Sequence, residues 1–121
     1  MKRKTYIAQI KKQCKNVGTY REEFSGIINK LAEMLENYDN VFEDFKNGGE
    51  EITIEYTNKN GSTNLVKNPM YLVLTELRKD ILSYYRELGL TPQGLKKYNE
   101  KLTENSKTKS ALDMALSNFK I

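Results

Sequence analysis

The chain has 121 residues, of which 38% are hydrophobic and 30% charged, a balance that suits one small soluble domain. It contains no histidine and a single cysteine, which excludes Ser-His and Cys-His nucleophiles, histidine metal sites and a disulfide within one chain. The net charge of +4 is uneven, at +7 over residues 1–21, −8 over 22–57 and +5 beyond, so we expect an anionic partner or contacts between copies.

The first segment, from about Thr5 to Val17, has the apolar spacing of an amphipathic helix, and Gly18 suits its C-terminal cap. Cys14 lies on the apolar stripe, so we expect a buried thiol. The segment and its continuation carry bases and no acid, which makes them candidate nucleic-acid contacts. The candidates are Lys2, Arg3, Lys4, Lys11, Lys12, Lys15 and Arg21. The alternative is a solvated chain end.

Apolar residues then repeat every three or four positions from Tyr20 to Lys46, which predicts a helix of about 40 Å. Thr19 and Glu22, three residues apart, predict a capping box at its start. Because so long a helix is hard to cover within a short chain, its stripe and the strand that follows form a candidate oligomer interface. The candidates are Ile27, Leu31, Leu35, Tyr38, Phe42, Ile52, Ile54 and Tyr56.

A β-hairpin is predicted at about residues 51–67, where Ile52, Ile54 and Tyr56 alternate with polar residues. Asn60-Gly61 predicts a two-residue type I′ turn, which places Tyr56 opposite Leu65. An isolated hairpin is marginal in water. We therefore expect it to pack on the helices or to extend a sheet across subunits.

Asn68 and Pro69 predict the N-cap and first residue of the next helix, and Gly89 predicts its end in a Schellman motif. Thr91 and Pro92 begin a further helix directly, so two helices are expected to meet at a sharp corner. On the new helix we expect an inward face and a basic outward face. The inward residues are Leu95, Tyr98 and Leu102, and Lys96, Lys97 and Lys101 are further candidate nucleic-acid contacts.

The C-terminal tail begins as a polar linker, and the helical spacing of Leu112, Leu116 and Phe119 predicts a short segment that docks on this chain or on a partner. We therefore divide the chain into a basic helical segment at 1–18, a helical core at 19–103 and a linker with a docking segment at 104–121. The predicted fold class is mainly α. Long amphipathic helices would pack as a helical hairpin or bundle with one short β-hairpin, and the chain would oligomerise.

In this order the elements resemble the small subunit of the DNA-packaging terminase of tailed bacteriophages. The likeness covers about Thr19 to Tyr98. Its most specific parts are Lys67-Asn68-Pro69 and the run ELGLTP at Glu87–Pro92, at the expected separation. The family pattern usually continues with two small residues and a base, whereas this chain has Gln93, Gly94 and Leu95. Lys96 or Lys97 would replace the charge of a family arginine but not its bidentate geometry.

The resemblance implies a protein without catalytic residues, metal or cofactor, in the cytoplasm of the bacterial host. It would assemble into a ring, bind double-stranded viral DNA near the packaging start and present it to the large terminase subunit, which holds the ATPase and nuclease. An alternative from another class is a helical assembly or adaptor module that binds protein partners without DNA. A metal-dependent nuclease would require clustered acids, and no acids stand at ligand spacing.

Overall fold

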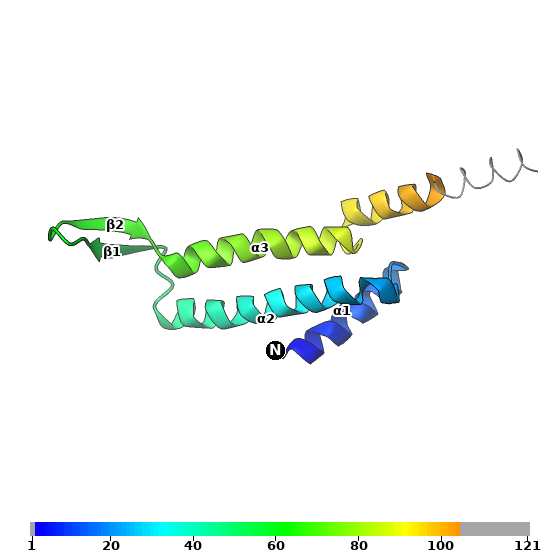
Figure 1. Cartoon of the computed structure of the whole chain (residues 1–121), viewed down its shortest axis with the longest axis horizontal. Coiled ribbons are helices and arrows are strands. Elements are labelled where there is room, and N and C mark those ends of the chain that lie inside the picture. The colour runs from blue at the N-terminus through cyan, green and yellow to red at the C-terminus, as the bar shows by residue number, and fades with distance from the viewer. Residues whose placement is uncertain (1, 105–121) are drawn as a thin grey trace, which may run out of the picture.

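The computed structural model describes residues 2–104, and within them the chain is mainly helical (Figure 1). The helices are α1 (Arg3–Val17), α2 (Ser25–Asn47) and α3 (Pro69–Glu87), followed by a helix over residues 92–104. The strands β1 (Thr53–Thr57) and β2 (Thr63–Lys67) form an antiparallel pair. The predicted fold class, a helical hairpin with one short β-hairpin, is confirmed.

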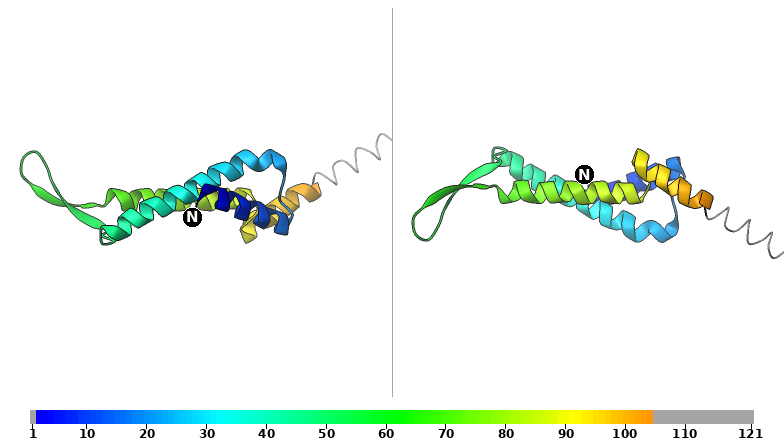
Figure 2. Two further views of the ribbon diagram at one scale, coloured as in Figure 1. Left: turned by 90° about the horizontal axis from the view of Figure 1, so that it is seen from below. Right: turned by 90° about the horizontal axis from the view of Figure 1, so that it is seen from above.

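The helices α2 and α3 lie side by side and antiparallel, and they form the body of the molecule (Figures 1 and 2). The β-hairpin projects from one end of this pair, beyond the ends of both helices. At the other end α1 packs against α2, close to the point where α3 ends. The molecule is therefore three-layered at one end and narrows to a two-stranded arm at the other.

The core lies at the three-layered end. Six residues there form one buried cluster, contributed by α1, α2 and the end of α3: Ile10, Cys14, Ile28, Leu31, Ala32 and Leu88. Cys14 is fully buried, as its place on the apolar stripe predicted, and burial raises the pKa of its thiol. Leu31, a predicted interface residue, is also fully buried in the single chain, where α1 and the end of α3 cover it.

The predicted start of α2 is wrong. Residues Glu22–Phe24 form a 3₁₀ turn and the α-helix begins at Ser25, so Thr19 and Glu22 make no capping box. The Thr19 hydroxyl is instead buried and donates a hydrogen bond of 2.7 Å to the Leu88 carbonyl. A carbonyl at the end of a helix has no partner within that helix, so this tertiary bond satisfies both groups and outcompetes the local cap.

The junction between α3 and the next helix follows the predicted cap chemistry. Gly89 is left-handed at φ 69°, and the Leu90 and Gly89 amides donate to the Tyr85 and Arg86 carbonyls at 2.8 and 3.0 Å, which is a Schellman motif. The Thr91 hydroxyl then accepts a hydrogen bond from the Gly94 amide at 3.0 Å, as an N-cap does. We call residues 88–95 the elbow.

The elbow is tight because the backbone of Gly94 lies against the end of α3. A Cβ on Gly94 would stand 2.3 Å from the Arg86 carbonyl oxygen. The helix over residues 92–104 leaves the end of α3 and does not fold back along it (Figures 1 and 2). Leu95 and Tyr98 are half-buried, but Leu102 is 40% exposed, so its predicted inward position is wrong: within residues 2–104 no element covers it beyond the elbow.

The hairpin register differs from the prediction by one residue. Tyr56 lies opposite Asn64, and Leu65 lies opposite Glu55. The Asn58 side chain accepts hydrogen bonds from the Asn60 and Ser62 amides, and only Gly61 of the loop has positive φ, at 82°. A type I′ turn needs positive φ at two residues. The Asn58 side chain instead stabilises a three-residue loop with one left-handed glycine, which shifts the pairing.

Candidate nucleic-acid interface

The helix α1 presents its bases on the side away from the core. Ile10 and Cys14, four residues apart, face α2, whereas Lys4, Lys11 and Lys15 recur at helical spacing on another face. Lys12 extends that face, and these lysines are exposed except for Lys11, which is half-buried. We call Lys4, Lys11, Lys12 and Lys15 the basic face of α1. Lys2 and Arg21, at the two ends of α1 and its connection, are also exposed.

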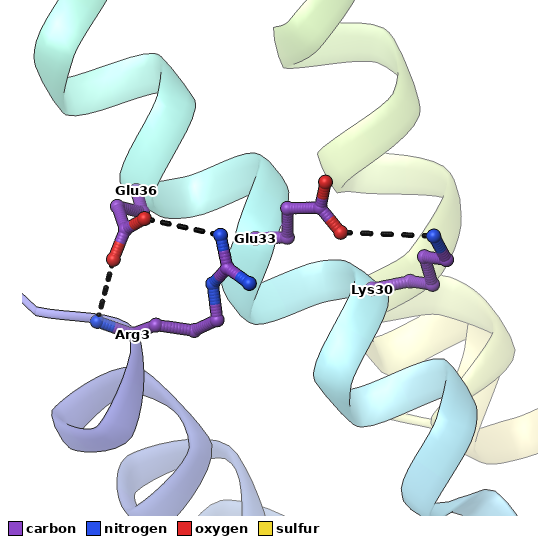
Figure 3. Close-up of polar contacts among 4 residues, drawn as sticks. All are labelled: Arg3, Lys30, Glu33 and Glu36. Atoms are coloured by element: carbon purple, nitrogen blue, oxygen red, sulfur yellow. Dashed lines mark hydrogen bonds and ion pairs between the residues drawn. The ribbon is translucent and has the colours of Figure 1, made fainter.

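Arg3 is paired with an acidic residue of its own chain, Glu36, and so differs from the lysines of the basic face. Its guanidinium lies 3.2 Å from a Glu36 carboxylate oxygen, and its backbone amide donates to the other oxygen at 2.8 Å (Figure 3). A carboxylate at a helix N-terminus satisfies a free amide and interacts favourably with the helix dipole. Glu36 of α2 therefore anchors the start of α1, and the predicted nucleic-acid contact of Arg3 would have to compete with this pair.

A second contact holds α1 beside α2 one turn further on. The Tyr6 hydroxyl donates a hydrogen bond to the Asp39 carboxylate. Burial, followed by this hydrogen bond and the negative charge of Asp39, raises the pKa of Tyr6 to about 12. The basic face of α1 is thus held in one orientation by two contacts from α2.

Figure 3 also shows an exposed ion pair within α2, between Lys30 and Glu33 at 3.7 Å, which contributes little to stability in water. It does not involve α1.

At the end of α1, the Lys15 ammonium stands 4.9 Å from the centre of the Tyr20 ring. A cation over an aromatic face is attracted by the ring but keeps its charge. Arg21 follows directly and is exposed. The cationic surface therefore continues from α1 into the connection to α2.

The helix over residues 92–104 carries the other three candidate bases, Lys96, Lys97 and Lys101, all exposed. Its first turn and the last turns of α1 line one groove of about 730 Å³ at the elbow. The groove is lined by Gln13, Asn16, Val17, Leu82, Tyr85, Gly89, Leu90, Thr91, Pro92 and Leu95. The two base-bearing helices therefore meet at the same end of the molecule, the end opposite the β-hairpin.

The predicted interface residues divide by exposure. Ile27, Phe42, Ile52 and Tyr56 are exposed, and Leu35, Tyr38 and Ile54 are half-buried. Tyr38 has partners in its own chain, because its ring stacks on Phe42 at 6.0 Å and its hydroxyl accepts a hydrogen bond of 2.9 Å from the Arg78 side chain.

The predicted interface did not include several apolar residues that the structure leaves exposed: Leu65, Val66, Met70, Leu72, Val73 and Leu82. Their apolar side chains suggested burial or contact, but the spacing of apolar residues does not tell which of them another element covers. Leu112, Leu116 and Phe119, predicted to dock on a partner, lie outside the described residues.

Across residues 2–104 no group of three or more histidine, cysteine or acidic side chains is arranged to hold a metal ion. In the same part of the chain no helix combines the length and apolar character of a membrane span.

Comparison with known protein families agrees with the resemblance carried by KNP and ELGLTP. A family model described as phage terminase, small subunit, matches residues 4–105. No curated protein and no solved structure matches the chain. The family match spans α1 to the end of the last described helix and includes the elbow and the basic face of α1. The chain therefore belongs to the phage terminase small subunit family.

Proposed function

We propose that this chain is the non-catalytic, DNA-recognising subunit of the terminase of a tailed phage or prophage. It would assemble into an oligomer in the cytoplasm of the bacterial host and recognise viral DNA at the start of packaging. It would also regulate a separate large subunit with ATPase and nuclease activity. Family membership supports the packaging role. The observation that carries the DNA-binding role is the basic face of α1, which bears no acid and whose lysines are exposed except for the half-buried Lys11.

The basic face suits phosphates better than base edges. Lysines are compact charges on flexible stems, and phosphate contacts by such groups release counterions and bind without reading sequence. Lys96, Lys97 and Lys101 are exposed on the helix that leaves the same end of the molecule. We infer that one end of each subunit binds the DNA backbone, and that specificity arises from the arrangement of subunits.

The oligomeric role rests on exposed apolar surface at the other end. Ile52 and Tyr56 of the hairpin and Phe42 of α2 are exposed in the single chain. A ring of copies would cover such surface, and it would gather many basic faces around one polyanion. We further propose that Leu112, Leu116 and Phe119 contact the large subunit.

The test measures binding of the chain to double-stranded DNA across a salt series, with matched charge variants. Lys12→Gln with Lys15→Gln removes two bases from the basic face of α1, and Lys59→Gln with Lys67→Gln removes two exposed bases from the hairpin end. For each lost phosphate contact, the slope of log affinity against log salt should fall by about 0.9. The slope should therefore become shallower in the α1 variant by about 0.9 for each of its two lost contacts. The hairpin variant should have the same slope as the parent.

Equal effects of the two variants would show attraction by net charge alone and would contradict a defined site on α1. Light scattering that finds assembled chains without salt-dependent DNA binding would instead favour the adaptor module. Mg²⁺-dependent cleavage of DNA by the purified chain would contradict the non-catalytic role.

A further inference from the structure

The groove of about 730 Å³ at the elbow is apolar and uncharged. It is lined by the last turns of α1 and α3, by the elbow itself and by the first turn of the helix over residues 92–104. None of its ten lining residues carries a charge, and two of its apolar side chains are open to solvent: Leu82 is 49% exposed and Val17 is 38% exposed. A groove without bases does not suit phosphates, so it is not a continuation of the basic face of α1. Its chemistry suits an apolar peptide.

An exposed track leads from this groove to the end of the described chain. Leu95 lines the groove, and the exposed Leu102 stands seven residues later, on the same side of the helix. A second hollow, of about 640 Å³, runs along the same helix and shares Pro92 and Leu95 with the groove. A segment that turned back after residue 104 would follow this track to the groove.

The sequence beyond residue 104 has the matching chemistry. Six polar residues, 105–110, are followed by a stretch from 111 to 119 that contains a single charged residue, Asp113. We call residues 105–121 the tail; the family match ends at its first residue. Its apolar residues at helical spacing are Leu112, Leu116 and Phe119.

We propose that the tail turns back and docks Leu112, Leu116 and Phe119 in the elbow groove of its own chain. The lengths of the segments allow this contact. The helix over residues 92–104 carries the chain about 18 Å away from the elbow, at 1.5 Å per residue. The six residues 105–110 span up to about 20 Å when extended, so they can bring the apolar residues back to the groove.

The covalent connection favours the chain's own tail over a second copy or another protein. A short flexible linker holds the segment it carries at a millimolar effective concentration beside its site. A free segment of equal affinity has to reach that concentration before it displaces the tail. The polar composition of residues 105–110 suits such a solvated linker.

Docking would join two helices that carry candidate DNA contacts. Val17 of α1 and Leu95 of the helix over residues 92–104 both line the groove, so a tail in the groove contacts both helices and restricts the angle between them. One consequence rests on the proposed function. The side chains proposed to contact the large subunit would be covered until that partner takes them, which would link its binding to the arrangement of the bases at the elbow end.

The experiment measures how fast a thiol in the groove of the full chain reacts with a maleimide. The native Cys14 is fully buried, so the thiol of Leu82→Cys can be labelled selectively, and cysteine keeps a small apolar side chain there. The same thiol is measured in a chain that also carries Leu116→Lys and Phe119→Lys. It should react at least about fivefold faster in that chain, because the parental tail fills the groove most of the time at its effective concentration.

Two controls isolate the docked contact. Ser110→Lys with Ser117→Lys adds the same charge to the tail on the side away from its apolar residues, and it should leave the thiol protected. Leu72→Cys places a thiol near the hairpin end of α3, at a side chain that is 46% exposed, and this thiol should react equally fast with either tail. The rates are compared over a dilution series, and protection by the chain's own tail should not depend on concentration.

The inference is overturned when Leu116→Lys with Phe119→Lys leaves the reaction rate of the Leu82→Cys thiol unchanged. Protection that disappears on dilution would also overturn it and would assign the groove to a second copy. Binding of the large subunit, measured with the same tail variant, tests the proposed function separately. Lost binding with an unchanged thiol rate would leave the large-subunit contact standing without the groove, and retained binding with a faster thiol would leave the groove standing without that contact.

Discussion

The two ends of the α2–α3 pair bury their apolar residues to very different extents. At the elbow end, α1 and the close of α3 cover Ile28 and Leu31 completely. At the hairpin end Phe45 and Leu74 are buried, but the strands that extend from it stay open to water. Both ends have similar apolar spacing in the sequence. The difference teaches that two packed helices bury single positions such as Phe45 and Leu74, whereas a continuous buried cluster forms only where α1 adds a third layer.

The largest expected effect is the difference in lost unfolding free energy between a substitution at the elbow end and one on the hairpin. Leu31→Ala removes a fully buried side chain from the elbow end and should lower the free energy of unfolding by about 2–5 kcal/mol. Leu65→Ala, at a side chain that is 73% exposed on the hairpin, should change it by less than about 0.5 kcal/mol. Urea denaturation followed by circular dichroism measures both. Similar losses at the two positions would abolish the distinction between a core end and an open end.

The tightness of the elbow gives a second, smaller effect. In Gly94→Ala the new methyl group would stand 2.3 Å from the Arg86 carbonyl oxygen, so the helix over residues 92–104 must shift. We expect a loss of about 1–3 kcal/mol in unfolding free energy. The matched control is Gly26→Ala in the first turn of α2, where a Cβ meets nothing within 4 Å. The control should equal or slightly exceed the parent in stability, and a Gly94→Ala protein as stable as the control would mean that the elbow is loose.

The smallest effect concerns how α1 is held at the elbow end, and it depends on pH. Because the pKa of Tyr6 is raised to about 12 from the usual 10.0, the folded chain keeps the phenol proton that the unfolded chain loses. The stabilisation is fully present below pH 10 and is lost as the pH rises towards 12.

Unfolding midpoints measured from pH 9 upward should therefore fall more steeply for the parent than for Tyr6→Phe. Tyr71→Phe, which changes a half-buried tyrosine at the hairpin end, serves as the control and should follow the parent. Parallel curves for the parent and Tyr6→Phe would show that the Tyr6–Asp39 contact does not hold α1.

Features governed by neighbouring residues were predictable from the sequence. The caps at Asn68, Gly89 and Thr91 depend on side chains and backbone conformations within a few positions, and the structure confirms them. Thr19 was misread because its hydroxyl bonds to Leu88, 69 residues away, in preference to a local amide. The hairpin register was misread because the Asn58 side chain, outside the expected turn, stabilises a longer loop.

The candidate interface was predictable to a similar degree. The lack of acidic residues in the first segment identified the bases of α1 as candidate contacts. In the structure these lysines are exposed, except for the half-buried Lys11. The partner of Arg3 was not foreseeable, because Glu36 lies 33 positions away and only the packing of α1 on α2 brings them together. In the same way, spacing indicated that the long helix was apolar on one side, but not that Leu31 would be covered by the chain's own helices.

The separation of the two ends has a mechanical consequence. The 23 residues of α2 make a strut of about 35 Å between the hairpin and the elbow. A tilt of roughly 10° about the hairpin end would move the elbow end by about 6 Å, nearly twice the axial spacing of about 3.4 Å between charges on one DNA strand. A small change of angle at the hairpin end would thus become a displacement of several ångströms at the end that carries the basic face of α1.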